Sequence, residues 1–300
     1  MTLSLRARFW RFVLRQTVKK RRLTIEQHRI SGAQMAAFFR LPPQVQVEKT
    51  VVAGLPAAWI RPNAADPRRV LLHLHGGGYV TGSIDSHLML CAPLAQTLEM
   101  NLLLPEYRLA PENPFPAALE DALTAYRWLL AQGAESIVVS GDSAGGGLAL
   151  ALTLALREAG DPLPAAVICL SPWADLTHQG QSHVTRLESE VVLTTETLEE
   201  WAACYAGAAN LTNPLISPVY ADFHGFPPLL IQVGSEEILL DDARALAEKA
   251  RAAGVCVELR IWDGLWHVWP ALGALIPESG QAFNEIKEFL HAQPPNRITA

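Results

Sequence analysis

Cysteines are scarce in this 300-residue sequence, and long apolar runs are absent. The four cysteines stand far apart and form no Cys-x-x-Cys pair, so neither a disulfide framework nor a zinc ribbon is indicated; they are Cys91, Cys169, Cys204 and Cys256. Widely separated thiols fit a reducing compartment, and we predict a cytoplasmic location. No apolar run reaches the roughly 18 residues that a membrane-spanning helix needs, so we expect no stable membrane insertion.

Acidic residues are missing from one end of the chain, where basic residues gather. Residues 1–22 hold eight of the 24 Lys and Arg residues and none of the 30 Asp and Glu residues, so the other 278 residues carry 16 basic and 30 acidic side chains, a net charge of −14. This acidic remainder argues against a nucleic-acid-binding protein. Residues 1–22 also lack the apolar region and cleavage site of a secretion signal. We predict an amphipathic helix there. A basic helix with aromatic side chains could contact lipid or nucleic acid, but the favoured interpretation is that its Leu/Phe/Trp face packs on the rest of the protein.

From residue 68 onward, apolar runs of strand length alternate with helical patterns. Strands are predicted within residues 69–77, 101–107, 136–143, 165–172, 228–235 and 255–262, and helices within 116–133, 144–162, 241–254 and 279–292. The predicted strands are apolar on both faces and most are separated by helices. This pattern indicates a mainly parallel sheet that is covered by helices on both sides.

Two segments do not follow this alternation, namely residues 1–45 and 177–215. We predict that both form a cap over the carboxyl ends of the strands, where open α/β sheets bind ligands. Residues 1–45 would be the N-terminal part of this cap and 177–215 an inserted segment. Residues 46–176 and 216–300 would together form the main domain. A length of 300 residues suits such an organisation.

A serine stands where a predicted strand meets a predicted helix, in Gly141-Asp142-Ser143-Ala144-Gly145. This is the pattern G-x-S-x-G, in which a sharp turn lifts the serine out of the sheet and glycines avoid backbone collisions. The N-terminus of the following helix favours negative charge. The alternatives are a structural turn and a phosphate-binding loop, but the latter needs a Gly-Lys-Ser/Thr sequence and no lysine is present. We predict that Ser143 is a nucleophile.

A serine nucleophile needs a base, an acid and a site for negative charge. The predicted strand before it ends in His75-Gly76-Gly77-Gly78, and consecutive glycines indicate a close approach of the backbone. We expect the N–H groups of these glycines, with that of Ala144, to hold an oxyanion. His73 and His75 alternate on this strand, but no acidic or Cys/His partner lies near them in the sequence, so no metal site is predicted.

Of the nine histidines, His267 fits the base best. It follows the last predicted strand, in agreement with the chain order serine, acid, histidine. The turn after the strand within 228–235 offers four carboxylates: Glu236, Glu237, Asp241 and Asp242. The first two are better placed at the strand end, whereas the last two fit the start of a helix.

Together these motifs resemble the hormone-sensitive lipase family, the bacterial type IV carboxylesterases. The likeness covers roughly residues 68–290 and includes "YRLAPENPFPAALED" (Tyr107 to Asp121) and "SPWADLT" (Ser171 to Thr177). It implies an α/β-hydrolase fold with a helical cap. It also implies a serine carboxylesterase that hydrolyses short- to medium-chain acyl esters through an acyl-enzyme, with no metal or organic cofactor. The roles that it implies are nucleophile for Ser143, base for His267 and oxyanion hole for Gly77, Gly78 and Ala144.

The acid departs from the commonest pattern of the family, D-P-L-x-D. When this pattern is laid on "EILLD", the catalytic position falls on Glu237 and the second aspartate on Asp241. Some relatives, including those that resemble lactone hydrolases, carry Glu-x-Leu-Leu at this place. We therefore predict Glu237 as the acid, with Glu236 as the alternative.

The resemblance leaves several functions open. The same three residues would serve a lactonase, an amidase or an acyltransferase. Plant gibberellin receptors resemble the family but have lost the catalytic histidine, so a non-catalytic ligand-binding protein is another alternative. Members of the family often dimerise, which leaves open a homodimer through the last strand and helix.

Overall fold

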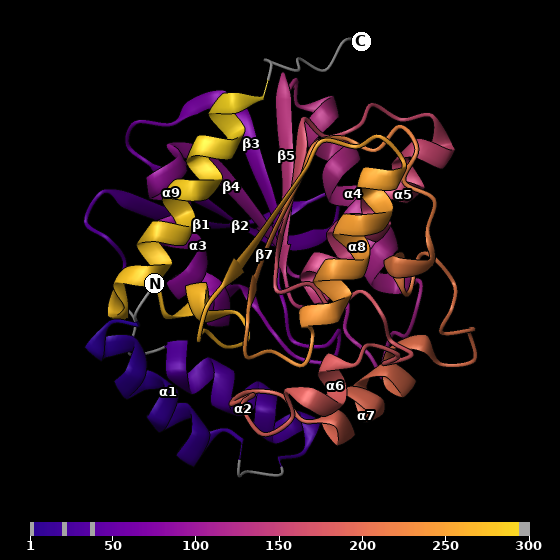
Figure 1. The fold of residues 1–300 in the computed structure, drawn as a ribbon. Coiled ribbons are helices and arrows are strands. Elements are labelled where there is room, and N and C mark those ends of the chain that lie inside the picture. The colour runs from indigo at the N-terminus through magenta and orange to yellow at the C-terminus, as the bar shows by residue number, and fades with distance from the viewer. Residues whose placement is uncertain (1–2, 20–22, 37–39, 294–300) are drawn as a thin grey trace.

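A computed structural model describes residues 3–19, 23–36 and 40–293 (Figure 1). The predicted segments 1–45 and 216–300 therefore include a few positions that lie outside the described residues. The division of the chain into a cap and a main domain stays a prediction. Among the described residues, no helix has both the length and the hydropathy to cross a membrane.

A sheet of eight strands forms the centre of the molecule, in the order β1-β2-β4-β3-β5-β6-β7-β8. The strands are β1 (Val45–Val52), β2 (Leu55–Pro62), β3 (Asp66–Leu74), β4 (Met100–Pro105), β5 (Ser136–Asp142), β6 (Ala166–Leu170), β7 (Leu229–Gly234) and β8 (Val257–Trp262). Strand β2 runs antiparallel to both neighbours, and all other pairs are parallel. The prediction of a mainly parallel sheet is confirmed.

The hairpin of β1 and β2 was not predicted from the sequence. Its turn is formed by Ala53 and Gly54, which both have positive φ angles (50° and 87°), as tight hairpins require. In β1 the adjacent charged residues Glu48 and Lys49 interrupt the alternation of apolar and polar side chains. The period-2 signal of a strand is therefore weak in this segment.

Helices cover both faces of the sheet (Figure 1). Helices α3 (Ile84–Leu98) and α9 (Pro277–Ala292) share one apolar core with the sheet, and α4 (Ala117–Ala131), α5 (Ala144–Ala159) and α8 (Leu240–Ala252) share another. Every residue of β6 and β7 is buried. Burial on both faces explains why these strands are continuous apolar runs in the sequence.

Four further helices gather along the edge of the molecule near the carboxyl ends of the parallel strands (Figure 1). They are α1 (Leu5–Thr17), α2 (Ile25–Ala36), α6 (Ser182–Thr185) and α7 (Thr195–Ala206). All four belong to the two segments that interrupt the strand and helix alternation, and they are called the capping helices below. The 3₁₀ helices η1 (Pro218–Tyr220) and η2 (Trp269–Leu275) lie in loops that follow α7 and β8.

The N-terminal helix is present as α1, but its packing differs from the prediction. Ala7 is buried and Trp10 is half-buried in a small core with residues of β8 and η2. In contrast, Leu5, Phe9 and Phe12 are exposed. The helix carries apolar side chains on two opposite faces, and only one face meets the protein. The predicted packing of the helix is therefore confirmed for Trp10 and Leu14 and wrong for Leu5, Phe9 and Phe12.

Candidate active site

Ser143 lies in a sharp turn between β5 and α5. Its φ and ψ angles are 54° and −123°, a region that non-glycine residues rarely adopt. Its N–H donates to the carbonyl oxygen of Leu170 at the end of β6 (2.8 Å). A Cβ at Gly141 would collide with the carbonyl oxygen of Gly145, and one at Gly145 with that of Leu74. Glycine is therefore required on both sides of the serine, as the G-x-S-x-G pattern indicates.

The structure brings Ser143, His267 and Glu237 together from three separate parts of the chain. Ser143 Oγ lies 2.9 Å from His267 Nε2, and His267 Nδ1 lies 2.9 Å from Glu237 Oε2. All three residues are buried. Such a serine, imidazole and carboxylate chain is the arrangement that activates a serine hydroxyl.

The other three carboxylates of the acid turn are used elsewhere. Glu236 Oε2 accepts a hydrogen bond from Arg11 Nη2 of helix α1 (2.9 Å). Asp241 accepts from the backbone N–H of Ser182 (2.8 Å), and Asp242 accepts from two backbone N–H groups after β6 (3.0 and 2.9 Å). The geometry therefore favours Glu237 over Glu236 as the partner of His267.

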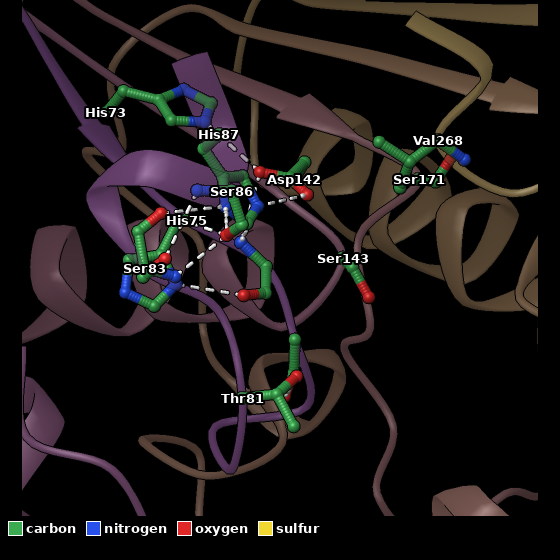
Figure 2. Close-up of polar contacts among 12 residues, drawn as sticks. His73, His75, Thr81, Ser83, Ser86, His87, Asp142, Ser143, Ser171 and Val268 are labelled. Carbon is green, nitrogen blue, oxygen red and sulfur yellow. Dashed lines mark hydrogen bonds and ion pairs between the residues drawn. The ribbon is translucent and has the colours of Figure 1, made fainter. Parts of the chain in front are cut away.

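A serine that was not predicted as a site residue holds Glu237 in place. Ser171, just after β6, donates its hydroxyl to Glu237 Oε1 (2.6 Å), which also accepts from the backbone N–H of Gly234 (2.6 Å). Ser171 Oγ in turn accepts from the N–H of Val268, the residue after His267 (3.1 Å). Figure 2 shows Ser171 directed at Val268. One hydroxyl thus fixes both the carboxylate and the histidine loop; the "SPWADLT" motif starts at this residue but does not reveal these contacts.

A second buried carboxylate, Glu190, comes from the segment between α6 and α7. Its Oε1 accepts from the N–H groups of Val191 and Val192 (both 2.8 Å), and its Oε2 accepts from that of Ile238, next to Glu237 (3.3 Å). Burial raises the pKa of Glu190, although the charge of His267 acts in the opposite direction. Glu190 joins the capping segment to the acid turn. Sequence reasoning missed it because nothing in its polar surroundings distinguishes it.

The surroundings of His267 raise its pKa above the ordinary value for histidine. Burial by itself would lower the pKa, because it disfavours the imidazolium ion. The hydrogen bond and charge of Glu237, with the more distant charges of Glu190 and Asp142, outweigh this effect. The imidazole is therefore set up to accept and hold a proton.

The glycine loop after β3 presents unused N–H groups. The φ angles of Gly77 and Gly78 are 116° and 61°. Within the described residues, neither of these N–H groups nor that of Ala144 donates a hydrogen bond, whereas the N–H of Gly76 donates to Asp142 Oδ1 (3.1 Å). The indole of Trp201, from α7, lies directly over Gly78, where a Cβ would collide with it. The predicted oxyanion donors are thus unpaired and lie under the capping helices.

A cavity of about 690 Å³ opens beside the same loop. Its lining combines Gly77 with charged and polar side chains of α2, α3 and the loop after β4, including His28, Arg29, His87, Glu106 and Glu112. The cavity provides room for a small polar group next to the glycine loop.

A buried network around Asp142 supports the glycine loop from behind (Figure 2). Besides the N–H of Gly76, Asp142 Oδ1 contacts His73 Nε2 (3.1 Å), and Asp142 Oδ2 lies 3.5 Å from His87 Nε2. His73 Nδ1 is 2.8 Å from Ser140 Oγ. Burial alone would raise the pKa of Asp142, but the two histidines hold it well below its usual range. His73 therefore belongs to a structural network, and among the described residues no group of three or more His, Cys, Asp or Glu residues is arranged to hold a metal ion.

Comparison with known proteins identifies the family. A family model of the alpha/beta hydrolase fold matches residues 71–271. An esterase of the bacterial hormone-sensitive lipase family, known from its crystal structure, is 44% identical with a TM-score of 0.93, and the match covers 98% of this chain and 99% of the other. This chain belongs to the hormone-sensitive lipase family. Its α/β-hydrolase fold and its family, both expected from the sequence motifs, are confirmed.

Curated relatives of this family member are named as ester hydrolases. An acetyl-hydrolase of Streptomyces hygroscopicus is 48% identical over 236 residues, which cover 78% of this chain and 79% of the relative. An ethyl acetate hydrolase of Pseudomonas putida is 35% identical over 248 residues, which cover 79% and 78%. The esterase described here is therefore a carboxylic ester hydrolase, and the non-catalytic alternative is set aside.

Proposed function

We propose that this esterase hydrolyses esters of short acyl chains, with Ser143 as nucleophile, His267 as general base and Glu237 as the acid that orients it. The observation that carries the proposal is the hydrogen-bonded chain from Ser143 Oγ to His267 and on to Glu237 (2.9 Å for each contact). The names of the relatives, acetyl-hydrolase and ethyl acetate hydrolase, favour a small acyl group.

In the first half of the reaction, Ser143 Oγ attacks the ester carbonyl carbon while His267 Nε2 takes the hydroxyl proton. The imidazolium then gives this proton to the departing alcohol, which leaves an acyl group on Ser143. In the second half, His267 takes a proton from water, the hydroxide attacks the acyl-enzyme, and the proton returns to Ser143 as the carboxylic acid leaves. The reaction consumes only the ester and one water molecule.

The negative charge of the tetrahedral intermediate needs donors that are already in place. The unpaired N–H groups of Gly77, Gly78 and Ala144 fit this role, and the last also stands at the N-terminus of α5, where the helix dipole adds positive potential. A donor of this kind typically lowers the barrier by about 3 kcal/mol. We propose these three groups as the oxyanion hole.

Glu237 fixes which imidazole nitrogen carries the proton. Because its carboxylate accepts from Nδ1, Nε2 is left without a proton and can act as the base. The carboxylate also stabilises the imidazolium that forms during the reaction, which agrees with the raised pKa of His267. Ser171 and Gly234 keep the carboxylate in this position.

The test is hydrolysis of p-nitrophenyl esters with acyl chains of increasing length by the wild type, Ser143→Ala and Glu237→Gln. We expect the highest kcat/KM for the shortest chains, no activity above background for Ser143→Ala, and a large loss for Glu237→Gln. Glu236→Gln is the matched control, since it changes the neighbouring carboxylate, which pairs with Arg11 instead. A large loss in Glu236→Gln with little change in Glu237→Gln would contradict the assignment.

The same enzyme assayed on an ester, a lactone and an anilide of equal size separates the remaining reaction types. An esterase prefers the ester, whereas faster turnover of the lactone or anilide would replace the proposal by lactonase or amidase activity. A cytoplasmic location and a homodimer through β8 and α9 stay predictions from the sequence. Strand β8 is an edge strand of the sheet, which supports the proposed interface and makes the molar mass in solution its direct test.

A further inference from the structure

Helix α1 exposes an apolar stripe that nothing in the described protein covers. Leu5, Phe9 and Phe12 are spaced at i, i+4 and i+7, so they share one face of the helix. They are 82%, 59% and 63% exposed. A hollow next to the stripe is lined by Leu5, Arg6, Phe9, Trp10, Ala274 and Leu275, and Leu275 is itself 41% exposed. The patch therefore extends from α1 onto η2.

Positive charge surrounds this stripe. Arg6, Arg8 and Arg15 are exposed, and none of them forms an ion pair within the described part of the chain. Neither α1 nor any other part of residues 1–22 contains an acidic residue, whereas the remaining 278 residues carry a net charge of −14. Basic and apolar groups thus coincide on one helix of an otherwise acidic protein.

We propose that α1 docks on an anionic lipid surface. Leu and Phe side chains would enter the boundary between headgroups and acyl chains, while the arginines contact lipid phosphates, as in interfacial amphipathic helices. The acidic remainder of the protein would be repelled by the same surface, so only the face around α1 can approach it. This proposal is independent of the triad assignment.

The charges favour a lipid surface over two other occupants. Two copies that met symmetrically through α1 would bring their unpaired arginines together. A nucleic acid would pair with the arginines, but binding to its phosphates would leave the Leu and Phe side chains exposed to water. Only an anionic lipid surface offers both negative charge and an apolar layer directly beneath it.

Polar contacts fasten helix α1 and its two ends to the rest of the enzyme, so docking would orient the whole molecule. Ser4 donates to Glu278 of α9 through its N–H and its hydroxyl (2.8 and 3.0 Å). Arg11 pairs with Glu236, and Lys19 donates to the carbonyl oxygen of Glu190 (2.7 Å). Figure 1 places α1 at the same end of the molecule as α2, α6 and α7. The docked enzyme would therefore turn its capping helices toward the surface, where apolar esters collect.

The experiment is sedimentation of the full chain with vesicles of phosphatidylglycerol and phosphatidylcholine in equal parts, and with vesicles of phosphatidylcholine alone. We expect the wild type to sediment with the anionic vesicles only, and high salt to weaken this binding. The double variant Phe9→Ser/Phe12→Ser should bind at least about tenfold more weakly, since both apolar anchors are lost. The double variant Arg8→Gln/Arg15→Gln should also bind more weakly.

The matched control is Val51→Ser, which removes an apolar side chain of similar exposure (65%) from the edge strand β1. It should bind vesicles like the wild type. Hydrolysis of soluble p-nitrophenyl acetate in the absence of lipid should be the same for the wild type and the three variants, which shows that the variants are folded and keeps this test separate from the proposed triad.

Several outcomes would overturn the proposal. One is a wild type that stays in the supernatant with anionic vesicles, and another is binding that Phe9→Ser/Phe12→Ser does not weaken. Loss of dimers in that variant, measured by light scattering without vesicle binding by the wild type, would show that a second copy covers the stripe. Retention of the wild type on duplex DNA but not on vesicles would assign α1 to nucleic acid.

Discussion

Two buried carboxylates of this esterase face histidines, but they serve different ends. Asp142 contacts His73 and His87 behind the glycine loop, and it also accepts from the backbone N–H of Gly76. Glu237 contacts a single histidine, His267, whose other nitrogen reaches Ser143. The hydrogen-bond partners of the Asp142 carboxylate therefore belong to the support of the glycine loop, whereas the histidine beside Glu237 leads to Ser143.

The pKa shifts follow the same division. Burial alone would raise the pKa of the Asp142 carboxyl, but the charge of His87 and the hydrogen bonds of His73 and His87 lower it. Burial alone would lower the pKa of His87, but the charge and hydrogen bond of Asp142 raise it. Both shifts favour the charged form of the group, as expected for a structural ion pair. The raised pKa of His267 has another use, because this imidazole gains and loses a proton in each half of the proposed reaction. Similar groups thus act as a fixed support at one place and as a proton carrier at the other.

Substitution of Glu237, the carboxylate beside His267, should have the largest effect on activity. In Glu237→Gln the neutral amide no longer stabilises the imidazolium, and it can hold His267 in the wrong tautomer. We expect kcat to fall about 10⁴-fold, the loss that follows when a triad aspartate becomes asparagine. Steady-state kinetics with an unchanged melting temperature would separate this loss from unfolding. A decrease of less than about tenfold would contradict the role of Glu237 as the triad acid.

Substitution of Asp142, the carboxylate behind the glycine loop, should mainly reduce the free energy of unfolding. Asp142→Asn leaves His87 buried without its counter-ion, and removal of one partner of such a pair typically costs about 3 kcal/mol. Since the pKa of Asp142 is lowered in the folded protein, its stabilising effect is present above about pH 4 and is lost as the pH falls below that value. In Asp142→Asn this stabilising effect is absent at every pH, so the free energy of unfolding of the variant should fall less than that of the wild type as the pH drops below about 4. Urea unfolding at several pH values measures both effects.

Asp175→Asn is the matched control for this experiment. Asp175 is also buried, but the contacts of its carboxylate within the described part of the chain are with its own turn, through Thr177 and Gln179. We expect a smaller loss of stability than for Asp142→Asn. An equal loss would show that the network behind the glycine loop is not special.

Ser171→Ala should have an intermediate effect on kcat. The variant removes a hydrogen bond to a charged carboxylate, which is typically worth roughly 1.5–3 kcal/mol, so kcat should fall at least about tenfold with little change in KM. Ser217→Ala removes another buried hydroxyl, whose hydrogen-bond donor within the described residues is the backbone N–H of Leu176, away from the triad. If both variants lose the same activity, Ser171 has no particular role in positioning Glu237.

Glu190→Gln should have the smallest effect, visible in the pH profile. The base must be neutral to act, and the charge of Glu190 helps to raise the pKa of His267. Without this charge the pKa falls, so the acid limb of the kcat/KM profile should move to lower pH. Glu188→Gln, an exposed neighbour in the same segment, should leave the limb in place. A shift to higher pH in Glu190→Gln would show that the charge of Glu190 does not act on His267 in this way.

Short sequence patterns were sufficient to predict the serine turn and most of the strands. The glycines around Ser143 are required by backbone contacts within one strand-to-helix turn, so a short motif reveals them. The alternation of apolar strands and helices reflects strands that are buried on both faces, and it predicted six of the eight strands. It failed for β1 and β2, which form a hairpin at the edge of the sheet and are less apolar.

The two carboxylates Glu236 and Glu237 show that local patterns do not predict which distant segment a side chain contacts. Glu236 and Glu237 are adjacent glutamates with the same sequence around them, but their side chains point in different directions. One meets Arg11 of α1 and the other meets His267. The contacts of Ser171 and Glu190 are likewise between segments that are far apart in the chain.

The sequence by itself determined the order of the six strands from β3 to β8 and of helices α4, α5, α8 and α9, the serine turn, the glycine loop and the histidine after the last strand, because each depends on residues that are close in the chain. It missed β1, β2 and α3. The sequence favoured Glu237 and left Glu236 as the alternative, and the tertiary structure shows that Glu237 is the one that faces His267. Only the tertiary structure decided what supports this carboxylate and which face of α1 remains exposed. These depend on where side chains from distant segments meet, and on which apolar surface finds a partner when the chain folds.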